Sequence, residues 1–522
     1  MIVLYENKVF LVTYGIAPES SGVTNATLNQ SKMFTDANYD VSITTFDYKP
    51  NYHQIFEELK SMNRVYKDIS HINKYQYYAE LNNPSGIIDT GFYDAESSFY
   101  EDGFTSYFDK DAENVVHFFK DGELVKTKTY DKGQFLQAVD YYNSSKEIAR
   151  RWEFSEDKYP IMQQFFSERT GNLSRESFYT SDGFCFLTRH HKEDGAAGEV
   201  FLFNRDENST QRFNGNKAHD KHWLNELALK HKISNKLPIF IANGQGSGTK
   251  VMGIPKKHAK RTFFVHNNHL GKPYTYGSDI KKRYEYVFNN IKKLDALIVL
   301  TEKQKQDIQR QFGMHENIYV IPNAISITEH EPEQKEEATV IMVTRLEGQK
   351  NLKKAIKIFP QVVKEVPNAK LNIFGKGKLE EELQEYIKKN GMENHIFLKG
   401  YSRNIKKEIK KSNLSLLTSH YEGLPLAAVE ALENETPVVS YDFNYGASDI
   451  IKDKETGYVI DLGNEEEMAS KVVYLLKNPQ VANKMGQAGR KDMILRYSSE
   501  VVYQKWMEML KKLESAEQSV IK

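Results

Sequence analysis

Two glutamates, Glu422 and Glu430, bracket a predicted helix start in the string EGLPLAAVE. An apolar run of strand length, Asn413–Ser419, precedes them, and Leu426–Glu433 carries apolar residues at helical spacing. A helix beginning after Gly423 presents unpaired backbone N–H groups and a positive dipole end, which suit a diphosphate. Glu422 could face a sugar ring and Glu430 a ribose diol, although acids at this spacing also occur on solvated helices by chance.

Two cations lie just beyond another predicted strand, residues 339–344. They are Arg345 and Lys350, in the loop RLEGQKN. Fixed cations of this kind would stabilise a departing diphosphate, and surface ion pairs are the alternative reading. Gly375 and Gly377 follow a strand in GKGKL, which lacks the third glycine of a dinucleotide fingerprint. We therefore predict a turn there, with a role near the bound substrate that carries the diphosphate.

His266 and His269 lie at the end of a predicted strand, residues 261–266, within VHNNHLGKP. Open α/β sheets bind ligands at the carboxyl ends of their strands, so a histidine here could contact sugar hydroxyls or a developing charge. An isolated loop histidine is more often structural.

Two basic clusters occur in the same region of the chain. One contains Lys256, Lys257, Lys260 and Arg261, and the other contains Lys281, Lys282 and Arg283. Most charge runs are solvated surfaces, but two on one domain favour a polyanionic acceptor, with the first cluster as its predicted binding residues.

Length and composition limit the classes of protein. With 522 residues, the chain is too long for one compact core. Lys plus Arg equals Asp plus Glu at 71 each, so net charge gives no indication of nucleic-acid binding. The single cysteine, Cys185, excludes an intrachain disulfide and a cysteine metal cage. No apolar run reaches the length of a membrane span, and MIVLYENK is not a signal peptide, so we expect a cytoplasmic protein.

The order of predicted elements indicates an α/β protein with an insertion. Strands at 8–14 and 40–46 alternate with helices at 24–34 and 52–62, which is typical of a parallel sheet. Aromatic-rich alternating runs then fill residues 92–213. Asp-Gly pairs at 102–103, 121–122 and 182–183 predict hairpins, hence an antiparallel meander. Asp109-Lys110-Asp111 has metal-motif spacing, but this setting favours a turn.

The α/β pattern resumes after the insertion and continues to the end of the chain. The predicted segments are a helix at 220–232, strands at 238–242, 261–266, 296–301 and 317–322, a polar linker at 325–338, strands at 339–344, 369–374, 395–398, 437–440 and 458–460, and a helix at 498–513.

The motifs R-L-x-x-x-K-N-L and E-G-L-P-L-x-x-x-E resemble those of the retaining GT-B glycosyltransferases of family 4. This resemblance implies a UDP-sugar donor, no metal or other cofactor, and catalysis by Lys350, Arg345, Glu422 and His266. The implied donor-binding residues are Gly22, Arg345, Lys350, Tyr401, Glu422, Gly423, Leu424 and Glu430. It makes His266 the first choice for the sugar contact and His269 the second, as an acceptor residue. In the family, the loop at Ser21-Gly22 usually contains two glycines. The resemblance therefore implies a donor-binding role for Gly22 but not for Ser21.

The first half adds a narrower resemblance. The string T-F-D-Y-K-x-N-Y at residues 45–52, followed by a helix and a β-rich insertion, is similar to wall teichoic acid α-glycosyltransferases. That resemblance implies transfer of glucose from UDP-glucose to poly(glycerol phosphate). The first alternative is transfer of N-acetylglucosamine from UDP-N-acetylglucosamine to poly(ribitol phosphate). It also implies a homotrimer formed through the inserted sheet, and allows a peripheral position at the inner face of the membrane.

The predicted fold is therefore GT-B, an α/β fold with two Rossmann-like domains facing a cleft and an antiparallel β-rich domain inserted in the first. The predicted domains are residues 1–72 and 216–328 for the acceptor domain, 73–215 for the insertion, 329–497 for the nucleotide-sugar domain and 498–522 for a helix crossing back to the first domain. Two other classes stay open, a glycosyltransferase acting on serine-rich proteins and a non-catalytic scaffold with the same fold.

Overall fold

The computed structural model describes residues 7–18, 22–110, 112, 114–233, 236–244, 246–325, 327 and 333–515. These fall into two compact units. The first unit contains Met1–Phe240 and Gly253–Ala259, and the second contains Ile241–Met252 and Lys260–Lys522. Ser21, Asp111, residues 326 and 328–332 of the polar linker, and residues 516–522 lie outside the described residues.

A seven-stranded parallel sheet has the strand order β17-β16-β15-β14-β1-β2-β3. Its strands are β1 (Lys8–Thr13), β2 (Asp40–Thr45), β3 (Ser70–Asn73), β14 (Ile239–Asn243), β15 (Lys260–Phe264), β16 (Ala296–Val299) and β17 (Ile318–Val320). The five inner strands are buried almost throughout, as both-side coverage by helices requires, whereas the edge strands β3 and β17 are partly exposed. The helices are α1 (Gly22–Asp36), α2 (Tyr52–Ser61), α3 (Lys74–Asn82), α5 (Asn216–Lys230), α6 (Gly248–Val251), α7 (Lys282–Phe288), η1 (Ile291–Lys293) and α8 (Glu302–Phe312). The predicted parallel α/β domain is confirmed.

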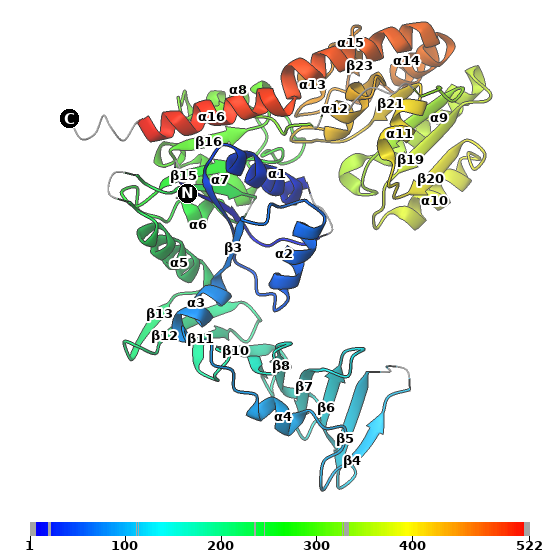
Figure 1. Ribbon diagram of the computed structural model, residues 1–522. Coiled ribbons are helices and arrows are strands. Elements are labelled where there is room, and N and C mark those ends of the chain that lie inside the picture. Colours follow the sequence, from blue (N-terminus) through cyan, green and yellow to red (C-terminus); the bar gives the residue numbers. More distant parts are fainter. Residues whose placement is uncertain are drawn as a thin grey trace. The chain divides into compact units, whose positions relative to one another are not determined.

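The insertion is a ten-stranded antiparallel meander in which each strand pairs with the next one in sequence. It comprises α4 (Gly91–Glu96), β4 (Thr105–Phe108), β5 (Val115–Lys120), β6 (Glu123–Tyr130), β7 (Leu136–Tyr142), β8 (Ile148–Phe154), β9 (Pro160–Phe166), β10 (Leu173–Tyr179), β11 (Cys185–His191), β12 (Ala197–Asn204) and β13 (Ser209–Phe213). The strands β4 to β8 are drawn in cyan in Figure 1. The predicted meander is confirmed.

The predicted Asp-Gly hairpins have different outcomes. Those at 121–122 and 182–183 join β5 to β6 and β10 to β11, with Gly122 and Gly183 at φ of 83°. The prediction of a hairpin at 102–103 is wrong, because the turn there follows α4 and a loop, and no strand precedes it. Asp109 lies in a turn, as expected, where its carboxylate accepts from the backbone N–H of Ala112 and contacts His117 at 3.3 Å.

The second unit contains a six-stranded parallel sheet with the order β20-β19-β18-β21-β22-β23. Its strands are β18 (Thr339–Val343), β19 (Lys370–Phe374), β20 (Ile396–Gly400), β21 (Leu414–Leu417), β22 (Val438–Tyr441) and β23 (Gly457–Ile460). Its helices are η2 (Gly348–Lys350), α9 (Leu352–Glu365), α10 (Glu380–Lys389), α11 (Ile405–Lys411), α12 (Leu426–Glu433), α13 (Ala447–Ile450), α14 (Glu465–Lys477) and α15 (Pro479–Tyr497). This is the second predicted Rossmann-like domain.

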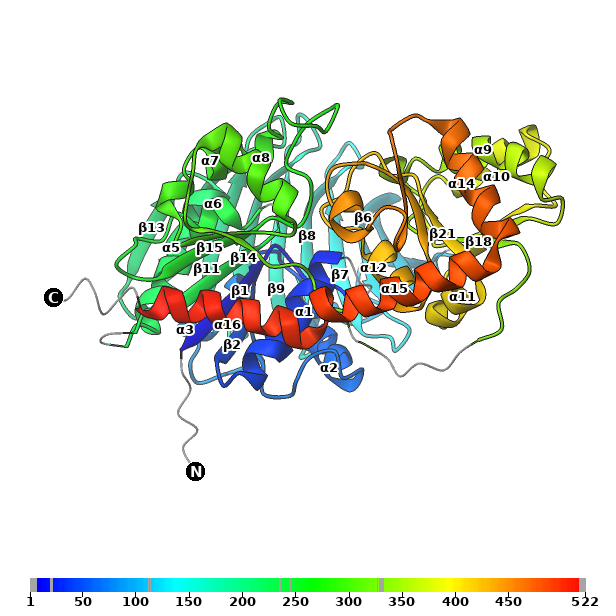
Figure 2. The ribbon, with the colours of Figure 1, turned by 90° about the horizontal axis from the view of Figure 1, so that it is seen from above.

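The helix α16 (Ser499–Ser515) follows α15 almost directly, as the red ribbon in Figure 2 shows. Its Trp506 is buried and packs edge to face on Phe264 of β15, with ring centroids 5.6 Å apart. The ammonium of Lys512 lies 5.7 Å from the ring centroid of Tyr319 on β17. The C-terminal helix thus leaves the six-stranded sheet and packs on strands of the seven-stranded sheet, as predicted.

Candidate active site

The strand order of the six-stranded sheet determines where its chemistry gathers. In sequence, β18 precedes β19 and β20, and the chain then returns to β21 on the other side of β18. The loops after β18 and β21 therefore leave the sheet in opposite directions from neighbouring strands. Such a switch point opens a crevice at the carboxyl ends of the strands. The predicted cations Arg345 and Lys350 follow β18, and Glu422 follows β21.

Lys350 and Glu422 meet at this switch point. The Nζ atom of Lys350 lies 2.6 Å from Oε1 of Glu422, and Glu422 is only 8% exposed. The Ser419 hydroxyl donates to the same Oε1 atom at 2.7 Å, and the Gln349 side-chain amide donates to Oε2 at 3.1 Å. Both carboxylate oxygens are therefore bonded, which fixes the position of a buried charge that would otherwise be costly.

Arg345 lies on the surface of the same loop. Its side chain is 62% exposed and forms an ion pair with Glu347 at 2.8 Å. The Gly375–Gly377 turn packs on this loop, because a Cβ atom on Gly377 would lie 2.4 Å from the carbonyl oxygen of Leu346. The Gly375 N–H donates to the carbonyl of Gly400 at 2.8 Å, which links the turn to the loop carrying Tyr401. Tyr401 is 75% exposed, so its ring contributes little to the core.

The helix α12 begins at Leu426 after Pro425, as the sequence predicts. The loop before it fits tightly, because a Cβ atom on Gly423 would lie 2.4 Å from the carbonyl oxygen of His266 and 2.7 Å from Cα of Asn267. The side chain of Leu424 is buried. Glu430 lies on α12 and is half-buried. Burial raises its pKa, the charge of Lys406 opposes this rise, and that of Glu433 adds to it.

His266 follows β15 and lies against the Gly423 loop through its backbone. Its Nε2 atom lies 3.0 Å from Oδ1 of Asn243, the last residue of β14. Burial lowers the pKa of His266 to about 3, so the ring is neutral at physiological pH. A neutral imidazole hydrogen-bonded at Nε2 can contact sugar hydroxyls without adding a positive charge.

His269 has a different environment, and a role in contacting an acceptor is not supported. The side chain is fully buried, stacks on Tyr445 with ring centroids 5.8 Å apart, and packs edge to face on Phe288. Burial, assisted by the charge of Lys281, lowers its pKa to about 3. His269 is therefore part of the packing between the segment after β15 and the loop carrying Tyr445.

Two residues of the first basic cluster, Lys260 and Arg261, also lie away from His266. Lys260 and Arg261 begin β15, whereas His266 follows its end, so they lie at opposite edges of the sheet. Arg261 is 7% exposed, its guanidinium donates to the carbonyl of Lys293, and it lies 3.7 Å from Asp295. Lys256 and Lys257 lie in the loop before β15. An acceptor role for Lys260 and Arg261 beside His266 is therefore not supported, whereas the role of Lys256 and Lys257 stays a prediction.

Gly22 is the first residue of α1 and belongs to the other compact unit. No atom lies within 4 Å of the position that its Cβ atom would take. Its role in binding the donor stays a prediction.

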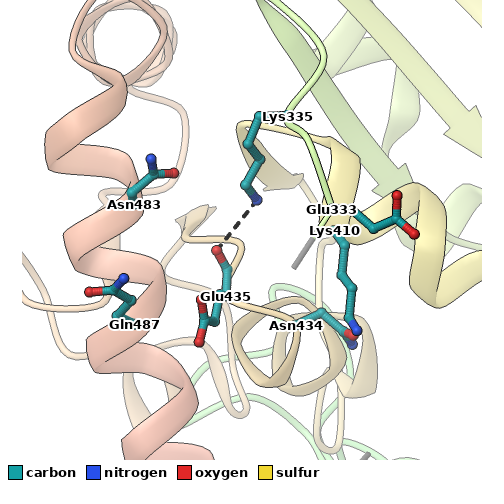
Figure 3. Close-up of a pocket in the computed structure, with 7 residues that line it drawn as sticks. All are labelled: Glu333, Lys335, Lys410, Asn434, Glu435, Asn483 and Gln487. Atoms are coloured by element: carbon teal, nitrogen blue, oxygen red, sulfur yellow. Dashed lines mark hydrogen bonds between the residues drawn. The ribbon is translucent and has the colours of Figure 1, made fainter. Parts of the chain in front are cut away.

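A pocket of about 180 Å³ lies at the opposite edge of the six-stranded sheet. It is lined by Glu333, Lys335, Lys410, Asn434, Glu435, Asn483 and Gln487 (Figure 3). Lys335 precedes β18, and its Nζ atom donates to the Ser412 carbonyl at 2.8 Å and the Thr436 hydroxyl at 3.1 Å. Glu333 and Lys335 precede β18, Lys410 precedes β21, and Asn434 and Glu435 precede β22, whereas Lys350 and Glu422 follow β18 and β21, so the pocket is separate from the Lys350–Glu422 site.

Within the described ranges, no group of three or more His, Cys, Asp and Glu side chains is arranged to hold a metal ion. The same part of the chain has no helix that is long and apolar enough to cross a membrane.

The sequence did not identify several residues that complete the site. Ser419 and Gln349 hold the two oxygens of Glu422, and Asn243 binds His266. Gln349 adjoins Lys350, and Ser419 lies three residues before Glu422, so their nearness in sequence was an available signal. For Asn243 the only signal was its position at the end of an apolar strand.

The comparisons with known proteins agree with this geometry. Residues 325–492 match the family model described as glycosyl transferases group 1. A solved structure of a mutant of Staphylococcus aureus TarM, in complex with fondaparinux, α-GlcNAc-glycerol and UDP, superposes with a TM-score of 0.84 at 26% identity. That match covers 96% of this chain and 99% of that one. The chain is a GT-B glycosyltransferase, and its residues 325–492 match the group 1 family model.

Two curated relatives match along nearly the whole chain. The poly(ribitol-phosphate) alpha-N-acetylglucosaminyltransferase of Staphylococcus aureus is 28% identical, over 96% of this chain and 99% of its own length. The poly(glycerol-phosphate) alpha-glucosyltransferase of Bacillus subtilis is 26% identical, over 95% of this chain and 74% of its own length. The resemblance to teichoic acid α-glycosyltransferases, first suggested by short motifs, therefore extends through the insertion and both Rossmann-like domains.

Proposed function

We propose that this glycosyltransferase moves an α-linked hexose from a UDP-sugar to hydroxyl groups of a teichoic acid, with retention at the anomeric carbon. The use of a UDP-sugar donor is supported mainly by one observation, the Lys350–Glu422 pair, whose charged atoms lie 2.6 Å apart at the switch point before α12. The names of the two full-length relatives support the acceptor half.

The specific donor and acceptor of this proposal are UDP-glucose and poly(glycerol phosphate), as in the name of the Bacillus subtilis relative. The alternative is UDP-N-acetylglucosamine with poly(ribitol phosphate), as in the name of the Staphylococcus aureus relative. The two pairs differ in one acetamido group on the sugar and in the length of the polyol.

The proposed reaction is a front-face displacement. The acceptor oxygen bonds to C1 of the hexose while the bond from C1 to the β-phosphate oxygen breaks, and a donor phosphate oxygen takes the acceptor proton. Lys350, Arg345 and the N–H groups at the start of α12 stabilise the negative charge that develops on UDP. Because cations and helix N–H groups supply this stabilisation, we expect the reaction to need no metal.

The remaining roles concern positioning. In the proposal, Glu422 accepts hydrogen bonds from hexose hydroxyls, Glu430 holds the ribose diol, and neutral His266 contacts the sugar. Backbone atoms at Gly423, Leu424 and Tyr401 border the phosphates and base, and Gly22 borders the sugar.

Self-association through the inserted sheet, as a trimer, is part of the proposal. The strand β4 is an edge strand of the meander, with Tyr107 48% and Phe108 46% exposed. Exposed edges with aromatic side chains favour association. Light scattering of the purified chain, compared with Phe108→Lys, would test this point.

The decisive experiment measures UDP release from UDP-glucose and UDP-N-acetylglucosamine, each with purified glycerol-type and ribitol-type teichoic acid. Release with one sugar and one polymer would identify both substrates, and NMR of the product would report the anomeric configuration. A matched reaction with EDTA tests metal independence. Turnover on a Ser/Thr-rich peptide, with none on either polymer, would contradict the proposed acceptor. Failure to bind or hydrolyse either UDP-sugar would favour a scaffold.

A further inference from the structure

The residue just before Glu422 belongs to a cluster that the donor site does not use. The carbonyl of Tyr421 accepts from the Gln349 side chain at 2.9 Å, which fixes its backbone beside the Lys350–Glu422 pair. Its ring packs against the ring of Tyr274, with centroids 4.1 Å apart. Tyr274 lies in the segment between β15 and α7, and Tyr421 lies in the loop after β21. This contact therefore joins a loop of the seven-stranded sheet to a loop of the six-stranded sheet within the second unit.

A lysine lies over this pair of rings. The Nζ atom of Lys281 is 4.1 Å from the ring centroid of Tyr421 and 5.4 Å from that of Tyr274. The same atom donates to the carbonyl of Asn268 at 2.7 Å. Lys281 is half-buried, and no carboxylate in the described part of the chain pairs with it. A half-buried cation with only neutral partners favours an anion beside it.

Further positive charges surround the rings. Burial lowers the pKa of Lys281 to about 8, and the charge of Arg283 adds to this effect. The charge of Arg283 also acts on Tyr421, against the upward effect of burial on the pKa of that phenol. Burial lowers the pKa of His420, and the charge of Lys272 adds to it. Lys281, Arg283 and Lys272 thus act together around Tyr421 and His420.

The acids of the two loops that carry Lys350 and Glu422 are already engaged. Glu422 is bonded by Lys350, Ser419 and Gln349, and Glu347 pairs with Arg345. Arg283 and Lys272 are exposed, and neither forms an ion pair with another described residue. The result is a local excess of positive charge one residue away from the carboxylate proposed to hold the transferred sugar.

We propose that Lys281, with Arg283 and Lys272, binds a phosphodiester of the acceptor chain, and that Tyr421 and Tyr274 form the surface on which the neighbouring polyol unit lies. This inference rests on the proposed function and assigns an acceptor site to the second basic cluster, beside the Lys350–Glu422 pair. Lysine is suited to phosphate as a point charge, and the tyrosine rings offer a flat apolar face with a polar edge. A phosphodiester here would place a hydroxyl of the next unit close to the donor sugar.

The test compares Lys281→Gln with Lys282→Gln in the full-length chain. Lys282 is the next residue, is exposed, and is the first residue of α7. Transfer is measured against poly(glycerol phosphate) and poly(ribitol phosphate) of defined length, at several salt concentrations. Loss of one charge-assisted contact should raise the KM for the polymer about tenfold in Lys281→Gln. The KM for the UDP-sugar should stay within about twofold, and the salt dependence of polymer binding should weaken. Lys282→Gln should resemble the wild type.

Two further variants separate a role of the charge from a structural one. Lys281→Arg retains the charge and should restore most of the polymer affinity. Arg283→Gln changes an exposed side chain, so it should fold normally and raise the KM for the polymer about threefold. An unchanged polymer KM and salt dependence in both Lys281→Gln and Arg283→Gln would overturn the inference while leaving the proposed function intact. A wild-type enzyme that transfers only to peptides would overturn both.

Discussion

The loops of the six-stranded sheet and those of the seven-stranded sheet differ in how their functional residues can be found. Around the six-stranded sheet, the residues predicted from short motifs, Lys350 and Glu422, meet at 2.6 Å. Around the seven-stranded sheet, Lys260 and Arg261 of the predicted cluster lie at the edge opposite His266, and the cations beside the site come from residues 272–283. In the proposed function, the donor-binding residues therefore lie within strand–loop–helix motifs, whereas the acceptor-binding residues depend on which loops the fold brings together.

The largest expected effect is on the donor side. Lys350→Ala should lower kcat about 100- to 1,000-fold, because it removes a fixed positive charge from the leaving diphosphate. The unfolding temperature should change much less, since Ser419 and Gln349 still bond Glu422. Steady-state UDP release and thermal unfolding measure the two effects.

Lys353→Ala is the matched control for this prediction, because Lys353 is half-exposed and pairs with Glu382 on α10. Near-normal turnover of Lys350→Ala would contradict the role of Lys350 in stabilising the leaving diphosphate. It would also remove the contrast between the loops of the six-stranded sheet and those of the seven-stranded sheet.

The next effect concerns the contact between the Gly423 loop and the segment after β15. Gly423→Ala should destabilise the fold by about 1–3 kcal/mol and reduce activity, because its methyl group overlaps the backbone of His266 and Asn267. Gly348→Ala is the control, since no atom lies within 4 Å of its Cβ position. Denaturant unfolding measures both, and equal stability of the two variants would show that the loops do not fit as tightly as described.

The pair His266 and His269 provides a smaller, pH-dependent effect. The pKa of His269 is about 3 in the folded chain, below its ordinary value of 6.5. Below pH 6.5, His269 therefore binds a proton in the unfolded chain but not in the folded chain. The free energy of unfolding keeps its full contribution from this group above pH 6.5 and decreases at lower pH. The decline is about 1.4 kcal/mol per pH unit for this fully buried group.

His269→Phe, which retains the aromatic packing on Tyr445, should reduce the dependence of unfolding free energy on pH by about one proton between pH 6 and pH 4. The exposed His53 on α2, changed to Gln, is the control. If His269→Phe keeps the wild-type pH dependence, burial of a neutral His269 is not what destabilises the chain in acid.

The smallest effect is expected at the first basic cluster. Lys257→Gln should leave the KM for either polymer within about twofold, since an exposed surface charge contributes little. The same assay applied to Lys281→Gln gives the opposite expectation. A large change in the polymer KM of Lys257→Gln would support acceptor binding by the first basic cluster. The motif-based prediction would then hold for the loops of both sheets.

Several features could be predicted because they depend on neighbours in sequence. The helix α12 begins and ends where apolar spacing places it, and the meander follows from alternating aromatic runs separated by turns. One such turn, at 102–103, was misread as a hairpin, because an Asp-Gly pair forms the same turn whether or not a strand precedes it. The meander was predictable because each of its strands pairs with the next one along the chain.

The sequence by itself determined the two Rossmann-like domains, the inserted sheet, and the identities of Arg345, Lys350, Glu422, Glu430 and His266 as candidates. Only the tertiary structure decided that β21 returns beside β18, so that Lys350 and Glu422 form a pair. It also decided that His266 lies at the site while His269, three residues later, is buried. The physical reason is that strand and helix formation follow local periodicity, whereas burial and the meeting of loops depend on contacts between residues far apart in sequence.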